Sequence, residues 1–332
     1  MKKTHVTKCL APVLISVYHR QYTLRRCIDA LLTNEEAAET DLFVVSDAAS
    51  RAEDVDRISS IRKYVKHLRG FKSVTLIARE VNLGSNKSIR TAIDELLNKY
   101  GRIVFMEDDI LPSKYYLGYM NNALDFYADN DKIFAVCGYK SNFAIPRSAK
   151  GEVFVLPRYS PWGVGLWANK RISGKCAELN RYDELKSAEP VLFKFLEEND
   201  PSFLSILKGD SEGKLKAGDV RVEYHLMRTG RCCLYPRTTM TNVMSSGDDA
   251  LHCGMKWIPD EPLATHRIED VGLYDPRYTE EIYRRFLLAK YPGVFRRFWG
   301  SLRCNGFRRT FAYYFSRLKR GGGGQNSRGL VE

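Results

Sequence analysis

Several signatures are missing from this chain of 332 residues, and each absence narrows the kind of protein it can be. No stretch approaches the roughly 18 to 20 apolar residues that span a bilayer, and Lys8 and Pro12 interrupt the N-terminal segment where a signal peptide would carry its apolar core. The eight cysteines form no C-x-x-C pair, which argues against a zinc ribbon or thioredoxin-like chemistry. No internal repeat is present. We therefore expect a globular protein of the cytoplasm.

Acidic residues are missing from one long segment near the C-terminus. Tyr283 to Arg320 contains eleven Lys and Arg, eleven aromatic residues and no acid, leaving only +1 of the net charge of +12 for the other residues. A basic, aromatic and helical segment suits an anchor on an anionic membrane surface. A docking helix with long arginine side chains and a nucleic-acid contact are the alternatives. We expect the membrane and not nucleic acid, which makes the protein peripheral at the inner face of the membrane.

Strands and helices alternate through the first 140 residues. Buried apolar runs predict strands, and apolar residues at helical spacing between them predict helices, which we expect to be capped by Thr23 and by Ser85 or Asn86. This alternation is typical of an α/β fold with a parallel sheet covered on both faces. The expected strands are 11–17, 41–46, 73–78, 102–106 and 133–138, and the expected helices are 24–32, 55–68, 86–97 and 115–127.

The composition and periodicity of the sequence change along the chain and suggest a division into four parts. Regular periodicity weakens after about residue 150, where tryptophans, turns and mixed charge take over. The expected parts are a ligand-binding half at 1–150, an acceptor-side half at 151–270, the basic helical extension at 271–320 and a flexible tail at 321–332.

Three adjacent acids, Glu107, Asp108 and Asp109, follow the apolar run 103–106. They repel one another, and a divalent cation is the expected source of compensation. The alternative is a solvated loop ahead of Pro112.

Other polar residues follow the neighbouring strands. In parallel α/β sheets ligands bind beyond the carboxyl ends of the strands, which brings these residues into one crevice with the acids. The loop Asn82–Lys87 runs into a helix N-terminus, a natural anion site, although it lacks the spacing of a P-loop or a dinucleotide fingerprint. The carboxylate of Asp47 can accept hydrogen bonds from a ribose or a base. Together these features predict a nucleoside-diphosphate site. The residues in the crevice are 18–20, 46–47, 82–87 and 107–109.

The order of several short motifs resembles that of inverting GT-A glycosyltransferases, especially family-2-like bacterial sugar transferases, and more distantly the N-acetylglucosaminyltransferase I group. The resemblance implies a mostly parallel, Rossmann-like sheet with helices on both faces and a C-terminal helical extension. It also implies metal-dependent transfer from a nucleotide sugar, expected to be UDP-linked, to a glycan or lipid-linked glycan in surface polysaccharide synthesis. The motifs are Val17-Tyr-His-Arg20, Val45-Ser-Asp47, Asn82-Leu-Gly-Ser-Asn-Lys87, Glu107-Asp-Asp109, Ser160–Trp167, Gly218-Asp-Val-Arg221 and Leu251-His-Cys253.

The resemblance also assigns roles. Glu107-Asp108-Asp109 corresponds to a DXD-type motif in which Asp109, with His252, holds Mn²⁺ or Mg²⁺. Asp219 corresponds to the catalytic base, although Gly218 stands where a tryptophan is usual, so Glu223 and Asp210 are the alternatives. The loop that carries His252 also departs from the family pattern. The donor-binding residues are Val17, Arg20, Asp47, Asn82, Lys87 and Asp108.

The sequence also allows two functions other than sugar transfer. A sugar nucleotidyltransferase would use the same scaffold, but it needs a glycine-rich N-terminal loop, and residues 17–25 contain no glycine. A non-catalytic protein that binds membrane or nucleic acid through its basic tail is the other. The segment Trp162–Trp167 suits either sugar stacking or core packing.

Overall fold

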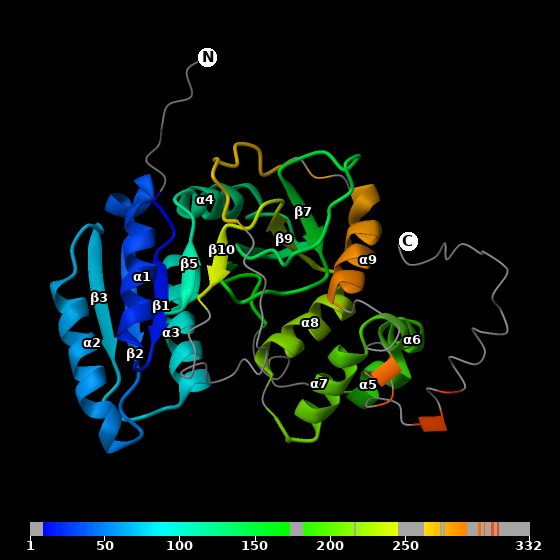
Figure 1. Ribbon diagram of the computed structural model, residues 1–332, viewed down its shortest axis with the longest axis horizontal. Helices are drawn as coiled ribbons and strands as arrows, with labels where there is room; N and C mark the ends of the chain where they lie inside the picture. Colours follow the sequence, from blue (N-terminus) through cyan, green and yellow to red (C-terminus); the bar gives the residue numbers. More distant parts are fainter. Residues whose placement is uncertain are drawn as a thin grey trace, which may run out of the picture. The chain divides into compact units, whose positions relative to one another are not determined.

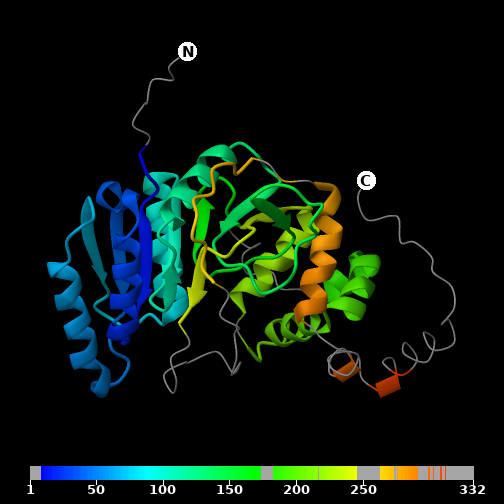
Figure 2. The ribbon, with the colours of Figure 1, turned by 45° about the horizontal axis from the view of Figure 1, so that its top comes forward.

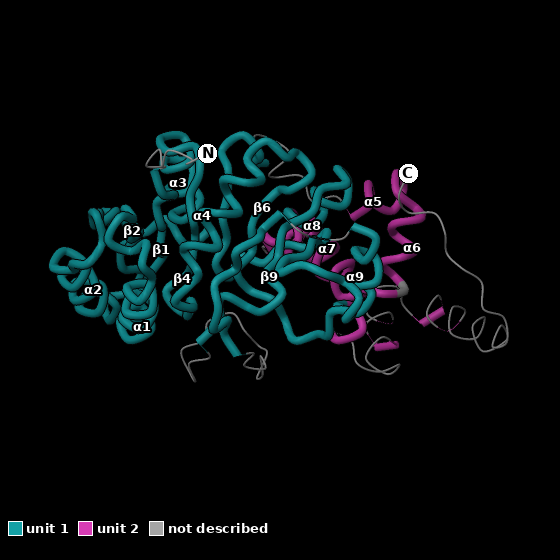
Figure 3. Tube along the Cα trace, turned by 90° about the horizontal axis from the view of Figure 1, so that it is seen from above, with its two compact units in different colours: residues 1–177, 222–286 teal, residues 178–221, 287–332 magenta. Residues whose placement is uncertain are grey.

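The computed structural model describes residues 9–172, 182–215, 217–244, 262–272, 274 and 276–290, together with positions 298, 299, 302, 307, 308 and 311. The chain divides into two compact units (Figure 3). Unit 1 comprises residues 1–177 and 222–286, and unit 2 comprises residues 178–221 and 287–332.

The first half of unit 1 consists of parallel strands joined by helices (Figure 1). β1 pairs with β2 on one side and β4 on the other, and β2 pairs with β3, all in parallel. Every residue of β1 is buried, because helices cover both faces of the sheet, α1 on one and α3 on the other (Figure 3). The elements are β1 Val13–Val17, α1 Gln21–Leu32, η1 Glu35–Glu39, β2 Asp41–Ser46, η2 Ala52–Asp54, α2 Val55–His67, β3 Ser73–Ala78, α3 Ser85–Tyr100 and β4 Arg102–Glu107.

The second half of unit 1 extends this sheet with three antiparallel pairs, β4 with β8, β6 with β8 and β7 with β9, and one parallel pair, β6 with β9. The described residues form an eight-stranded sheet in the order β3-β2-β1-β4-β8-β6-β9-β7, and a separate pair, β10 and β5. The yellow β10 arrow is visible in Figures 1 and 2. The elements are β5 Ile110–Pro112, α4 Tyr116–Phe126, β6 Ile133–Cys137, β7 Val153–Leu156, β8 Val164–Trp167, β9 Cys232–Pro236, β10 Thr241–Val243, η4 Pro276–Tyr278 and α9 Thr279–Lys290.

Unit 2 is helical where it is described. Its helices α6 and α7 each begin with a proline, which suits a position whose N–H has no helical partner. The carboxylate of Asp200 caps α7 by accepting from the Phe203 N–H at 3.3 Å. The helices are α5 Tyr182–Ala188, α6 Pro190–Asn199, α7 Pro201–Ser211 and α8 Gly218–Thr229, and α8 begins in unit 2 and continues into unit 1.

The expected α/β fold is confirmed, with a mostly parallel sheet flanked by helices and the first four strands within two residues of prediction. Two details were wrong. The strand β8 was not predicted, and it lies antiparallel between β4 and β6. The predicted helix caps are also wrong, because Arg20 and Gly84 occupy the N-cap positions of α1 and α3. Gly84 has a φ of 77°, a conformation that favours glycine.

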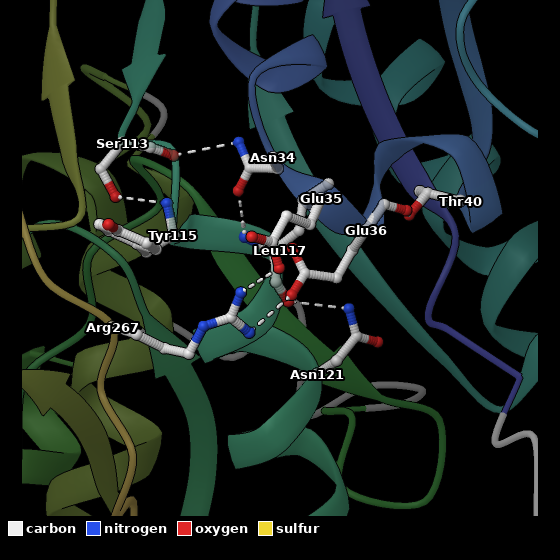
Figure 4. A network of polar contacts seen from close by, with 9 residues as sticks. All are labelled: Asn34, Glu35, Glu36, Thr40, Ser113, Tyr115, Leu117, Asn121 and Arg267. Atoms are coloured by element: carbon white, nitrogen blue, oxygen red, sulfur yellow. Dashed lines mark hydrogen bonds and ion pairs between the residues drawn. The ribbon is translucent and has the colours of Figure 1, made fainter.

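A polar network fastens the segment 262–272 to the N-terminal part of unit 1 (Figure 4). Arg267 bridges Glu35 at 2.7 Å and Glu36 at 3.1 Å. A Cβ on Gly118 would lie 2.7 Å from the Glu36 Oε1 atom, so α4 approaches this ion pair closely only because it carries glycine there. The network holds η1, α4 and the segment after residue 261 together.

A buried lysine joins α4 to the strands behind it. Lys170 is 1% exposed, its ammonium group donates to the carbonyls of Tyr127, Asn130 and Ile133, and it lies 3.8 Å from the centre of the Trp167 ring. Burial lowers the pKa of Lys170 to about 8, to which the nearby Arg231 contributes. One buried side chain therefore satisfies the carbonyl at the end of α4 and two carbonyls of the segment that leads into β6.

Candidate functional site at the carboxyl ends of β1 to β4

Arg20 and the strand-end acids form the centre of the site. The pairing of β1 with β4 places the residue after β4 beside the end of β1, and the Asp108 N–H donates to the Ser16 carbonyl at 3.0 Å. Arg20 then donates to Asp108 through Nε at 3.0 Å and Nη2 at 2.6 Å, and to Asp109 through Nη1 at 2.8 Å. The Thr23 hydroxyl donates to the same Asp108 carboxylate at 3.0 Å. One guanidinium therefore bridges both carboxylates.

Burial and charge oppose each other in this cluster. Burial raises the pKa of Asp108 above its ordinary value, because it outweighs the lowering by the guanidinium of Arg20. Burial alone would lower the pKa of Arg20, but the carboxylates of Asp108 and Asp109 together outweigh burial and raise it. The arginine is therefore permanently charged. It supplies part of the compensation that the sequence led us to expect from a metal ion.

The carboxylates differ in their capacity to hold a divalent cation. Both oxygens of Asp108 accept hydrogen bonds from Arg20, and its side chain is 5% exposed, whereas Asp109 accepts one bond from Arg20 and is 15% exposed. Within the described part of the chain, no group of three or more His, Cys, Asp or Glu is placed to bind a metal. Mg²⁺ commonly takes only one or two protein carboxylates beside substrate phosphates. Asp109 fits that role better than Asp108, and His252 lies outside the described residues.

Asp47 presents a buried acceptor at the end of β2. Its Oδ1 atom accepts from the Ala48 N–H at 2.9 Å and the Leu83 N–H at 3.0 Å, and the side-chain amide of Asn82 donates to the Ala48 carbonyl at 2.6 Å. The other oxygen, Oδ2, is buried and has no hydrogen-bond partner in the described structure. A buried carboxylate oxygen without a donor is costly, so this atom is suited to receive an N–H or O–H group from a ligand.

Arg62 of α2 fixes the turn that carries Asp47. Its Nη2 atom donates to the carbonyls of Ser46, Asp47 and Arg79 at 3.1, 3.0 and 2.9 Å, and Nε donates to the Ser46 hydroxyl at 3.2 Å. These carbonyls lie at the ends of β2 and β3, where the backbone hydrogen bonds between the two strands stop. The sequence gives no sign of this role, because an arginine on an amphipathic helix is expected to point to solvent.

The comparisons with known proteins identify the domain that contains this site. Residues 13–177 match the family described as Glycosyl transferase family 2. The segment is a family 2 glycosyltransferase domain. This domain is accordingly that of a glycosyltransferase. The more distant likeness to the N-acetylglucosaminyltransferase I group receives no support from these comparisons, and no curated protein matched the chain.

Solved structures align with the enzyme at low similarity. The mannosyltransferase PcManGT from Pyrobaculum calidifontis, in complex with GDP-Man and Mn²⁺, is 12% identical over 93% of this chain and 79% of its own, with a TM-score of 0.44. S. aureus TarS is 16% identical over 55% of this chain, with a TM-score of 0.33, and the alignment spans 32% of the TarS chain. TarS 1–349 in complex with UDP-GlcNAc is 14% identical over 48% of this chain and 45% of its own, with a TM-score of 0.32.

The remaining predicted donor-binding residues of the glycosyltransferase have clear positions. Val17 is the buried last residue of β1. Asn82 is exposed in the loop after β3, and Lys87 is exposed in the first turn of α3. Tyr18 was predicted only as a member of the crevice, and its hydroxyl donates to Asp54 at 2.9 Å and bonds with Ser50 at 2.8 Å. Of the predicted crevice residues, Tyr18, Arg20, Asp47, Asp108 and Asp109 each take part in side-chain hydrogen bonds that hold them in place.

The candidate bases occupy different environments. Asp219 is exposed in the first turn of α8, in the part of that helix assigned to unit 2. Glu223 is buried in unit 1, where Arg158 forms an ion pair with it at 3.0 Å. Asp210 accepts from the Arg221 guanidinium at 2.7 and 3.2 Å and from the Ala217 N–H at 2.9 Å, which ties it to the start of α8.

The two tryptophans of the 162–167 motif also differ. Trp167 is buried and its Nε1–H donates to the Leu124 carbonyl at 3.0 Å, so it belongs to the core. Trp162 is half-buried and its ring meets that of Tyr139 edge to face, with 4.7 Å between the ring centres.

No described helix combines the length and apolar content that crossing a bilayer requires.

Proposed function

We propose that the enzyme is a metal-dependent, inverting glycosyltransferase that takes a UDP-linked sugar and transfers it to a glycan or lipid-linked glycan of a surface polysaccharide. The observation that carries the donor assignment is the unpartnered Oδ2 atom of Asp47. Uracil presents a ring N–H, and an ionised carboxylate accepts hydrogen bonds and donates none. The carboxylate is held in position through its other oxygen by Ala48 and Leu83.

The strand-end acids divide the work of binding the diphosphate. Asp109 holds Mn²⁺ or Mg²⁺, which when bound neutralises the negative charge that develops on the leaving nucleoside diphosphate. Asp108 stays with Arg20 and Thr23 and faces the ribose side. Lys87 supplies positive charge from the first turn of α3, where it opposes the helix dipole but suits an anionic ligand.

Asp219 is the proposed general base. Inverting transfer needs one carboxylate to take the proton from the acceptor hydroxyl as its oxygen attacks the anomeric carbon, and it needs no covalent intermediate. Glu223 would have to leave its buried ion pair with Arg158 to take this role, and breaking such a pair is costly. This contrast supports Asp219 over Glu223 as the proposed base.

The proposal is tested by binding and by turnover. UDP titrated with and without Mn²⁺ should bind more tightly with the metal, and hydrolysis of UDP, GDP and TDP sugars should be fastest for a UDP sugar. In the Asp219→Asn variant we expect unchanged UDP binding and transfer slowed by about 10² to 10⁴-fold. A variant that kept the full transfer rate would reassign the base, and absence of UDP binding with metal would refute the donor site.

The proposed membrane partner depends on residues beyond α9. Ile282 and Tyr283 are buried, and the Phe286 ring contacts that of Phe143 with 5.8 Å between centres, so the start of the basic segment packs within unit 1. Deletion of residues 291–332 therefore tests the anchor without removing this helix. We expect weaker sedimentation with anionic liposomes and no change with neutral ones, and unchanged partition into the anionic liposomes would refute the anchor.

A further inference from the structure

Arg20 compensates its two acidic partners unequally. Asp108 receives two hydrogen bonds from the guanidinium and a third from Thr23, and its side chain is 5% exposed. Asp109 receives a single bond from Nη1, at 2.8 Å, and is 15% exposed. The Nε and Nη2 edge of the arginine is therefore firmly anchored, while the contact with Asp109 can be exchanged without loss of that anchor.

A divalent cation and the Nη1 group of Arg20 compete for the same carboxylate. Both carry positive charge, and two cations within a few ångströms of each other repel strongly in a partly buried site. The carboxylate of Asp109 stabilises one of them at close range. A metal ion that binds Asp109 must therefore weaken or break the contact with Nη1.

We propose that Arg20 is a resident counter-cation for Asp109, and that a divalent metal displaces its Nη1 group, which then donates to a phosphate oxygen of the nucleotide. The statement rests on the proposed function, both for the metal at Asp109 and for the nucleotide. An N–H group released from Asp109 needs a new acceptor, and a diphosphate supplies one beside the metal. Metal and nucleotide consequently bind cooperatively. The metal frees the Nη1 group that donates to the phosphate, and the phosphate supplies the acceptor that Nη1 loses when the metal binds Asp109.

Binding of Mn²⁺ alone, followed by its electron paramagnetic resonance signal, tests the exchange. Arg20→Gln removes the competing charge, so we expect Mn²⁺ affinity to rise by about ten-fold to 100-fold, the range set by one charge-assisted hydrogen bond. Arg20→Lys keeps the charge but cannot hold two carboxylates with one planar group, so its affinity should rise to an intermediate value. Adding Asp109→Asn to Arg20→Gln should abolish the gain.

A matched control separates local exchange from a general change of charge. Arg25→Gln removes the same charge from the exposed side of α1, where Arg25 stacks on Tyr64 at 4.1 Å from the ring centre. This variant should bind Mn²⁺ as the unaltered protein does. Equal affinity of the unaltered protein and Arg20→Gln would overturn the proposal. An affinity of Arg20→Lys equal to that of the unaltered protein would also overturn it, because the effect would then be one of charge and not of contact.

A second measurement distinguishes failure of this exchange from failure of the proposed function. In the unaltered protein UDP should tighten Mn²⁺ binding, and in Arg20→Gln this coupling should shrink by about the factor gained for Mn²⁺ alone. If the Mn²⁺ pattern holds but no variant binds a nucleoside diphosphate, the exchange stands and the proposed donor site falls. If UDP coupling is the same with and without Arg20, the transfer of Nη1 to phosphate is refuted. Should Arg20→Gln not fold, Arg20→Lys must still bind Mn²⁺ more tightly than the unaltered protein.

Discussion

The substitution Asp47→Asn reverses the hydrogen-bonding character of the proposed base pocket while it keeps the pocket's frame. The asparagine oxygen can still accept from the N–H groups of Ala48 and Leu83, which the Asp47 Oδ1 atom accepts at 2.9 and 3.0 Å. The amide nitrogen then takes the place of Oδ2, so a donor faces the ligand where an acceptor stood. Uracil, which presents a ring N–H, loses its partner, whereas cytosine, which presents a ring nitrogen acceptor at the same position, gains one.

The expected size of the change follows from the bond that is lost. A hydrogen bond to a charged group contributes about 1.5 to 3 kcal/mol, and each 1.4 kcal/mol is a factor of ten in Kd at about 25 °C. We therefore expect UDP affinity to fall by about ten-fold to 100-fold and the ratio of UDP to CDP affinity to fall further.

Calorimetric titration of UDP and CDP, both with Mn²⁺ present, measures this change. The control is Asp41→Asn, at the opposite end of β2, where the carboxylate accepts from the Ser73 hydroxyl at 2.6 Å. It should leave both affinities unchanged. Unaltered UDP binding in Asp47→Asn would refute the role of Asp47, and an equal loss of UDP and CDP affinity would show that the substitution had disturbed the loop instead.

Three further expectations follow from the same structure. Asp109→Ala should abolish the stimulation of donor hydrolysis by Mn²⁺, and a variant still stimulated would place the metal elsewhere. Glu223→Gln replaces the carboxylate of the buried ion pair with Arg158 by a neutral amide, so the melting temperature should fall while the rate of the remaining folded enzyme persists, and a large fall in kcat without loss of stability would favour Glu223 as base. Lys170→Met leaves three carbonyls without their donor and should destabilise the protein by about 2 to 4 kcal/mol in urea unfolding. The pKa of Lys170 is lowered from 10.5 to about 8 in the folded protein, so between these values the unfolded chain binds more protons at this residue than the folded protein does. The stability of the unaltered protein therefore rises with pH in this range, whereas the variant lacks this contribution. The stability lost on substitution should accordingly increase as pH rises from 8 to 10. A loss that stayed constant over that range would contradict the lowered pKa.

The parallel half of the sheet and the crevice at its edge could be predicted from the sequence. Apolar runs with helical spacing between them are local properties, and β1 to β4 carry them without interruption. Once four parallel strands are accepted, the residues that follow them must meet at one edge, which is why Arg20, Asp47 and the strand-end acids could be predicted to lie together. Family 2 membership agrees with that reading, whereas the metal and the base remain proposals.

Tertiary structure alone decided how the charges at that edge are arranged. β8 enters between β4 and β6 through backbone pairing, and its short sequence with Gly165 gives no periodic signal. The fork from Arg20 to Asp108 and Asp109 joins residues 88 and 89 positions apart, and Arg62 reaches carbonyls that no side-chain pattern reveals. The local periodicity of the sequence determines which side chains reach the carboxyl edge of the sheet. Which of these side chains neutralise one another depends on distances of a few ångströms, and those distances are set only when the sheet has formed.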